Sequence, residues 1–200
     1  MKVYLIRHAE KERGGYFNPH LRHQDEPITA HGRQQAENLC AYFATRPVGA
    51  IYVSAYQRAW QTAAPLAERL GLEPIVDERL NEIDNGRLDG MSDEEVQASY
   101  PDVWQAFQDQ SADFRFPGGE TGEEARDRVA ALLEETRLAS EGDVVLICHE
   151  GLIRIQMCYI LGLPVYDRWN FHVDFCGITE VVAGGGNKGW TLIRFNQVIL

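Results

Sequence analysis

The sequence is poor in cysteine and in basic residues, and it has no long apolar run. Its four cysteines among 200 residues form no Cys-x-x-Cys pair, so the spacing gives no sign of a disulfide framework. No apolar run approaches the ~18 residues that a membrane-spanning helix needs. The first residues become charged at Arg7, too early for the apolar region of a secretory signal. These absences predict a soluble, cytoplasmic protein with reduced thiols.

The charge balance limits the classes of partner. The chain has 30 acidic and 19 basic side chains, a net charge of -11, while its 44% hydrophobic and 24% charged residues are ordinary for a globular protein. Nucleic acids and anionic membranes both favour a surplus of Lys and Arg. We therefore expect neither as a partner, although a small and locally basic pocket remains compatible with this composition.

Short apolar runs alternate with helical patterns along the chain. Val3–Ile6, Ala50–Val53 and Asp143–Cys148 are typical of buried strands, and the segments that follow them show apolar residues at helical spacing. This alternation predicts a three-layer α/β/α sandwich with a mostly parallel sheet. Ile178–Val182 and Trp190–Phe195, joined through the turn at 184–187, predict an antiparallel hairpin at its edge.

We expect one domain over residues 1–200. Two capping-box patterns, Ser92 with Glu95 and Thr121 with Glu124, predict helix starts. The Ser92–Glu95 pattern lies in a less regular stretch, between the strand expected at Ala50–Val53 and the one expected at Asp143–Cys148. We therefore expect residues 85–117 to form a helical insertion that caps the ligand site and sets its specificity.

Polar residues follow three of the expected strands. Arg7 and His8 follow the first strand, Arg58 follows the second by five residues, and His149 follows the third. Ligands of open α/β sheets bind beyond the carboxyl ends of the strands. Two guanidinium groups there would match the oxygens of a phosphate. Taken singly, each histidine is more often a hydrogen-bonded structural residue, and Arg58 a solvated charge; their joint placement favours a site.

The sequence also resembles the histidine phosphatase (phosphoglycerate mutase-like) superfamily. Six motifs carry the resemblance, in family order. They are Leu5–Glu10 (the Arg-His-Gly signature), Asp25–Ala36 (D-x-P-L-T-x-x-G-x-x-Q-A), Ser54–Ala63 (S-P-x-x-R-A-x-Q-T-A), Leu80–Gly90 (L-x-E-x-x-x-G-x-x-x-G), Phe116–Thr121 (F-P-G-G-E-S/T) and Cys148–Arg154 (H-G-x-x-I-R).

The resemblance implies a role for each matched residue. His8 would attack phosphorus to give a phosphohistidine, Arg7 and Arg58 would clamp the phosphoryl oxygens, and His149 would donate a further hydrogen bond, as a neutral or a protonated imidazole. Glu82 would protonate the leaving alkoxide and then activate water, for which it should be partly desolvated. Nearby guanidinium charges should lower the pKa of His8. The resemblance implies that this reaction needs no metal, and we expect no cofactor.

The chain departs from the family pattern at several positions. Ala9 and Ala55 replace Gly and Pro, which are small changes. Glu150 replaces the usual Gly after the second histidine and brings a carboxylate near the pocket, where it either points away or restricts anionic substrates. In the loop 11–24, Asn18 is the candidate for a phosphate-binding Asn of the family, and no counterpart of the family's Gln is found.

The preferred hypothesis is a metal-independent phosphomonoester hydrolase that acts on a small phosphorylated metabolite. A mutase is the second hypothesis, although the family's mutases are typically longer than 200 residues. A catalytically silent phosphate-binding module is the third. A metal hydrolase built on His20 and His23 is the fourth, on a weak spacing signal. The substrate and the oligomeric state stay open.

Overall fold

The protein contains a six-stranded mixed sheet, seen in a computed structural model that describes residues 1–139, 141–186 and 189–199. The strand order is β5-β4-β6-β1-β7-β8. Strands β4, β5, β6 and β1 are parallel, and β7 and β8 are antiparallel to their neighbours. The predicted parallel sheet with an antiparallel edge is confirmed. Asn187, part of the predicted hairpin turn, lies outside the described residues.

The strands and helices have the following bounds. They are β1 Lys2–Arg7, β2 Phe17–Asn18, β3 His23–Gln24, α1 Ala30–Phe43, β4 Val48–Val53, α2 Gln57–Leu70, β5 Ile75–Val76, α3 Asp93–Ser99, α4 Pro101–Asp109, α5 Gly122–Ala139, β6 Asp143–Cys148, α6 Glu150–Leu161, β7 Ile178–Ala183 and β8 Trp190–Gln197, with short 3-10 helices η1 Glu78–Leu80, η2 Gly86–Leu88 and η3 Val165–Asn170.

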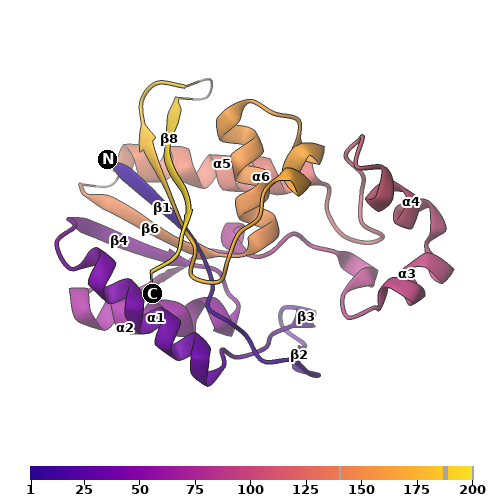
Figure 1. Ribbon diagram of the computed structural model, residues 1–200, viewed down its shortest axis with the longest axis horizontal. Helices are drawn as coiled ribbons and strands as arrows, with labels where there is room; N and C mark the ends of the chain where they lie inside the picture. The colour runs from indigo at the N-terminus through magenta and orange to yellow at the C-terminus, as the bar shows by residue number, and fades with distance from the viewer. Residues whose placement is uncertain (140, 187–188, 200) are drawn as a thin grey trace.

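Helices cover both faces of the sheet (Figure 1). Because side chains of a strand alternate between faces, Tyr4 and Ile6 of β1 pack with α1 and α2, whereas Val3 and Leu5 pack with α5 and α6. Strand β6 has no exposed residue, as expected for a central parallel strand covered on both faces. The predicted three layers are therefore present.

Local sequence signals account for the helix ends. The Thr29 hydroxyl caps α1 by accepting from the Gly32 amide at 2.9 Å, and both bonds of the Ser92–Glu95 capping box are formed at α3. Helix α6 begins at Glu150, directly after His149, and ends before Gly162 in the left-handed conformation.

Helices α3 and α4 lie beyond the end of the sheet, away from the other helices (Figure 1). They pack around a small apolar cluster of their own, centred on Leu88, Val96 and Phe116. We call residues 85–117 the cap segment. Its two ends meet at Gly86 and Gly119, where the amide of Arg87 donates to the carbonyl of Pro117 at 2.8 Å.

Candidate active site

The sheet register brings the predicted residues together. Arg7 pairs with Cys148 across β1 and β6, so the next residues, His8 and His149, lie at the same edge. The amide of His8 donates to the carbonyl of Cys148 at 2.9 Å, and the two imidazole rings are 5.1 Å apart between centroids. The expectation that the strand ends converge holds for both histidines.

The ring nitrogens of His8 have distinct roles. Its Nδ1 lies 2.8 Å from the carbonyl oxygen of Ala9. A carbonyl can only accept, so the hydrogen-bond pattern assigns the proton to Nδ1 and leaves a lone pair on Nε2. Burial first, and then the charges of Arg58 and Arg7, hold the pKa of His8 well below its usual value. The predicted direction is correct, but burial contributes more than the arginines. A neutral, oriented imidazole is suited to nucleophilic attack.

Both predicted arginines already contact carboxylates. Arg7 donates from Nη1 to the carbonyl of Val173 at 2.6 Å and lies 3.0 Å from the Glu150 carboxylate. Arg58 Nη1 lies 3.4 Å from the Glu26 carboxylate, and both side chains are buried. Each guanidinium also stacks on an aromatic ring, Phe175 in the first case and Tyr56 in the second. These contacts fix the planes of the two guanidinium groups beside His8.

His149 is held by a serine that the sequence motif contains. Ser54 Oγ lies 2.7 Å from His149 Nε2 and accepts a hydrogen bond from the Tyr56 amide at 3.3 Å. The Ser54 hydroxyl can donate its proton to Nε2, and in that arrangement the imidazole proton lies on Nδ1. Burial, together with Arg58, lowers the pKa of His149 well below its usual value. A protonated His149 is thus disfavoured, and its donor capacity comes from Nδ1–H of the neutral ring.

Three buried nitrogen atoms around His8 have no hydrogen-bond partner in the part of the chain that the structure describes. They are Nε of Arg7, Nε of Arg58 and Nδ1 of His149. A buried donor without a partner costs roughly 1–3 kcal/mol. Such groups therefore cluster where a ligand supplies the acceptor. Three donors beside a neutral imidazole suit an oxyanion with several acceptor atoms.

The side chain of Glu82, which follows η1 in the chain, contacts the N-terminus of α6. Its carboxylate accepts hydrogen bonds from the amides of Leu152 at 3.0 Å and Gly151 at 3.2 Å. A Cβ on Gly151 would meet the carboxylate at 2.9 Å, so only glycine allows this approach. The side chain is half-buried, in agreement with the predicted partial desolvation. Arg7, His8 and His149 come from strand ends and Arg58 from the first turn of α2, whereas Glu82 comes from a loop after η1.

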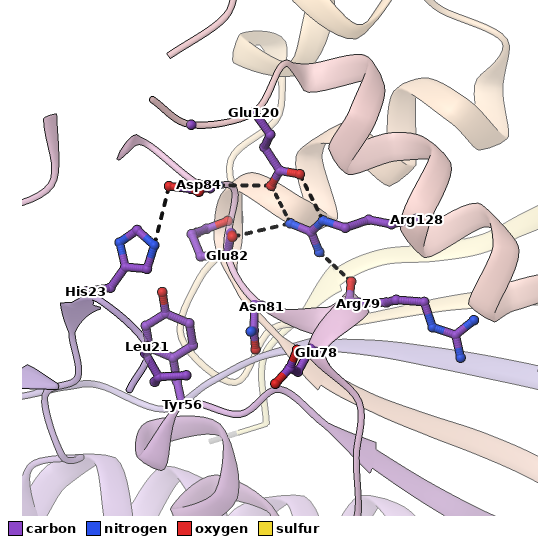
Figure 2. A pocket seen from close by; sticks show the side chains of 11 residues that line it. Leu21, His23, Tyr56, Glu78, Arg79, Asn81, Glu82, Asp84, Glu120 and Arg128 are labelled. Carbon is purple, nitrogen blue, oxygen red and sulfur yellow. Dashed lines mark hydrogen bonds and ion pairs between the residues drawn. The ribbon is translucent and has the colours of Figure 1, made fainter. Parts of the chain in front are cut away.

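A cavity of about 490 Å³ opens beside Glu82. Figure 2 shows Tyr56, Asn81 and His23 around the same space, with Arg128 bonded to Glu120 and to the carbonyls of Arg79 and Glu82 on the far side. The backbone around Glu82 is therefore anchored to α5. Motif reasoning did not single out Arg128, and a buried-face arginine on an amphipathic helix carries no distinctive sequence signal.

Asn18 is placed in a hairpin. Its Nδ2 donates to Asp25 at 2.9 Å and its Oδ1 accepts from the His20 amide at 3.0 Å. Both ends of the amide are thus used within the loop, and no contact between Asn18 and the two histidines of the site is present in the described residues. Asn18 pairs with His23 across β2 and β3, and its partner Asp25 lies 4.0 Å from Arg58.

His20 and His23 have different surroundings in the loop. His23 lies 3.4 Å from Asp84 and 3.3 Å from Asp89, while His20 is exposed. Within residues 1–139, 141–186 and 189–199, no group of three His, Cys, Asp or Glu side chains is placed to hold a metal ion. Over the same ranges, no helix is long and apolar enough to cross a membrane.

Comparison with known proteins assigns the family. The model described as "Histidine phosphatase superfamily (branch 1)" matches residues 3–198. The chain belongs to this superfamily.

Relatives within the histidine phosphatase superfamily have different names. The chain is 33% identical over 178 residues to a protein named phosphoserine phosphatase 1 from Hydrogenobacter thermophilus, covering 87% of this chain and 82% of the relative. It is 32% identical over 191 residues to one named "Probable phosphoglycerate mutase" from Enterobacter sp. (strain 638), covering 90% and 84%. A mycobacterial glucosyl-3-phosphoglycerate phosphatase with inorganic phosphate superposes with a TM-score of 0.82 at 25% identity, covering 99% of this chain and 98% of that one.

Proposed function

We propose that the protein hydrolyses phosphomonoesters of small metabolites through a phosphohistidine at His8. The observation that carries this proposal is the neutral imidazole of His8, with Nε2 free of a proton, beside three buried donors without partners. Phosphoryl transfer needs mainly alignment and charge stabilisation on the equatorial oxygens. Two guanidinium groups and the Nδ1–H of His149 supply both.

In the first step, the lone pair of His8 Nε2 attacks phosphorus while the bond from phosphorus to the alcohol oxygen breaks. Protonated Glu82 transfers its proton to the departing oxygen, which leaves as the alcohol. Arg7, Arg58 and His149 hold the three equatorial oxygens as charge moves onto them. The carbonyl of Ala9 accepts from Nδ1–H and stabilises the positive charge that develops on the ring.

In the second step, the Glu82 carboxylate accepts a proton from water as the water oxygen attacks phosphorus. The phosphorus–nitrogen bond breaks, its electron pair returns to Nε2, and inorganic phosphate leaves. Glu82 is protonated again and His8 is neutral again, so the cycle closes. Neither step uses a metal ion or a cofactor.

We favour hydrolysis over a mutase reaction. A mutase must retain the alcohol and exclude water while the phosphohistidine is intact. The cavity beside Glu82, at about 490 Å³, has room for several waters, each of which occupies roughly 30 Å³ in the liquid. The cap segment is the element that we propose sets specificity, and phosphoserine and phosphoglycerates are the first substrates to test, because relatives bear those names.

The experiment that tests this function is hydrolysis of p-nitrophenyl phosphate in the presence of EDTA. Wild type should turn over and His8→Ala should not, while His31→Ala, which removes an exposed histidine on α1, should behave like wild type. Intact-protein mass after alkaline denaturation should show a phosphorylated species that requires His8. Activity abolished by EDTA would contradict the mechanism, and ligand binding without turnover of any phosphomonoester would favour a silent binding module.

A further inference from the structure

Glu150 places a carboxylate against one of the two phosphate-binding arginines. It is the first residue of α6, directly after His149, and one of its carboxylate oxygens lies 3.0 Å from Arg7 Nη2. The other oxygen pairs with Arg154 one turn along the helix. The Glu150 side chain is only 24% exposed and that of Arg7 is 15% exposed. This carboxylate is therefore a fixed part of the site and not a solvated surface charge.

Glu150 also faces the space in which an alcohol group would leave. A cavity of about 240 Å³ is lined by both Glu82 and Glu150, together with Arg154, Arg168 and Trp169. Glu82 is the group that would protonate the leaving oxygen. An alcohol within reach of Glu82 in this cavity therefore also lies next to the charge of Glu150.

The cations nearest to Glu150 in this cavity already have carboxylate partners. Arg154 is paired with Glu150, and Arg168 is paired with Asp113 at 3.2 Å, although Nε of Arg154 and Nη2 of Arg168 have no hydrogen-bond partner in the described residues. A substrate carboxylate that accepted from either nitrogen would lie in the cavity that Glu150 also lines. Like charges brought together in a partly buried site are strongly unfavourable. An ammonium group, by contrast, would gain a partner.

We propose that Glu150 determines the charge selectivity of the site, favouring phosphomonoesters whose alcohol is neutral or carries an ammonium group over those whose alcohol carries only a carboxylate. This inference rests on the proposed hydrolase function and deepens it. It assigns the alcohol of the substrate to the class of uncharged or amine-bearing small molecules. Glycine at position 150, the usual residue of the family motif, would lack this discrimination.

The test compares three substrates in wild type and in Glu150→Gln. Glycerol 3-phosphate is the neutral reference, phosphoethanolamine carries an ammonium group, and 3-phosphoglycerate carries a carboxylate. The variant should raise kcat/KM for 3-phosphoglycerate relative to glycerol 3-phosphate by roughly 10-fold or more, the size expected for removing one like-charge contact. It should lower the ratio of phosphoethanolamine to glycerol 3-phosphate. Ratios within one protein cancel any general effect on phosphate binding or folding.

Glu123→Gln is the matched control. Glu123 also lies in the first turn of a helix and pairs with an arginine three residues later, but it is largely exposed. The control makes the same change in net charge and should leave all three ratios unchanged. Unchanged ratios in Glu150→Gln would overturn the proposal and leave Glu150 as an anchor of Arg154.

Failure of the hydrolase function gives a different result. In that case wild type would turn over none of the three esters nor p-nitrophenyl phosphate. Dissociation constants of the same three compounds, measured by calorimetry in wild type and Glu150→Gln, then provide the same ratios without turnover. Selectivity that shifts in binding would support the role of Glu150, and selectivity that does not shift would overturn it.

Discussion

At the scale of single residues, the chemistry of this site depends on which imidazole nitrogen carries the proton. His8 bonds through Nδ1 to a carbonyl, whereas His149 bonds through Nε2 to the hydroxyl of Ser54. The two rings therefore adopt complementary roles, one with a free lone pair and the other with a free N–H. Neither assignment requires a charged histidine.

Removing the Ser54 hydroxyl should disturb the position of the proton on the His149 ring. In Ser54→Ala, we expect kcat to fall roughly 10- to 100-fold, as it does when other partners that orient a functional histidine are lost. The imidazole ¹⁵N chemical shifts should show Nδ1–H in wild-type His149 and a mixture of tautomers in the variant. Ser54→Thr, which keeps a hydroxyl, should restore the wild-type tautomer. A wild-type His149 protonated at Nε2 would contradict the assignment.

Replacing Glu82 by Gln should distinguish a role of Glu82 in proton transfer from a role in which it only bonds to the amides of α6. The amide oxygen of Gln can still accept from the helix amides, so the free energy of unfolding should change by only about 1 kcal/mol. Hydrolysis of an alkyl ester, whose alkoxide needs a proton, should slow by roughly 10²–10⁴-fold. Formation of the phosphohistidine from p-nitrophenyl phosphate, whose leaving group needs no proton, should slow far less. Equal losses for both esters in single-turnover assays would exclude the general-acid role.

At the scale of elements, the position of the cap segment is set by close backbone contact at its base. Gly86 has φ +55°, and a Cβ there would meet the carbonyl oxygen of Pro117 at 2.4 Å. Such a contact leaves no room for a side chain between the two ends of the cap segment. This junction lies four residues after Glu82, so its geometry also limits the position of the proposed general acid.

We therefore expect Gly86→Ala to lower the free energy of unfolding. The left-handed conformation should cost about 1–2 kcal/mol and the clash a further ~1–3 kcal/mol. Gly71 provides the control, since it has φ +66° with nothing near its Cβ, and Gly71→Ala should show the conformational cost alone. Urea unfolding of both variants measures the difference. Equal losses of stability would show that the backbone contact at Gly86 can relax without cost.

At the scale of the whole molecule, an acidic protein has assembled a site with several cations. Every arginine at the centre of the site in the described residues has a carboxylate beside it, Glu150 for Arg7 and Glu26 for Arg58. The net charge of -11 is thus compatible with anion binding, because the site is cationic only through locally oriented donors.

The two buried histidines should make the stability of the molecule depend on pH. Their folded-state pKa values lie below the unfolded value of about 6.5. As pH falls below about 6.5, the unfolded chain binds protons that the folded chain does not, so the free energy of unfolding decreases towards the lower, folded pKa. Urea unfolding between about pH 7.5 and pH 5 should show this decrease.

Two variants isolate the histidine contribution from that of the carboxylates. In His149→Gln the decrease should be smaller than in wild type, because one depressed group is gone. In His172→Gln, which changes a mostly exposed histidine, the decrease should match that of wild type. An unchanged pH dependence in His149→Gln would mean that burial of this ring does not penalise its charged form.

The sequence by itself determined the layered α/β fold and predicted five residues for the proposed site. Strand and helix periods are local, so Val3–Ile6 and Asp143–Cys148 could be identified as buried strands from their composition. Because parallel strands end at the same edge of a sheet, Arg7, His8 and His149 could be expected to converge.

Only the tertiary structure decided what each of these residues contacts. Ser54 lies 95 positions from His149, and Glu150 lies 143 positions from Arg7, so neither contact has a local pattern in the sequence. The same holds for the half-buried position of Glu82 at the start of α6. Asn18 matches a family residue by position, yet its side chain bonds to Asp25 and to the His20 amide. Proton positions and charge pairing arise from packing between distant segments, which composition and spacing do not encode.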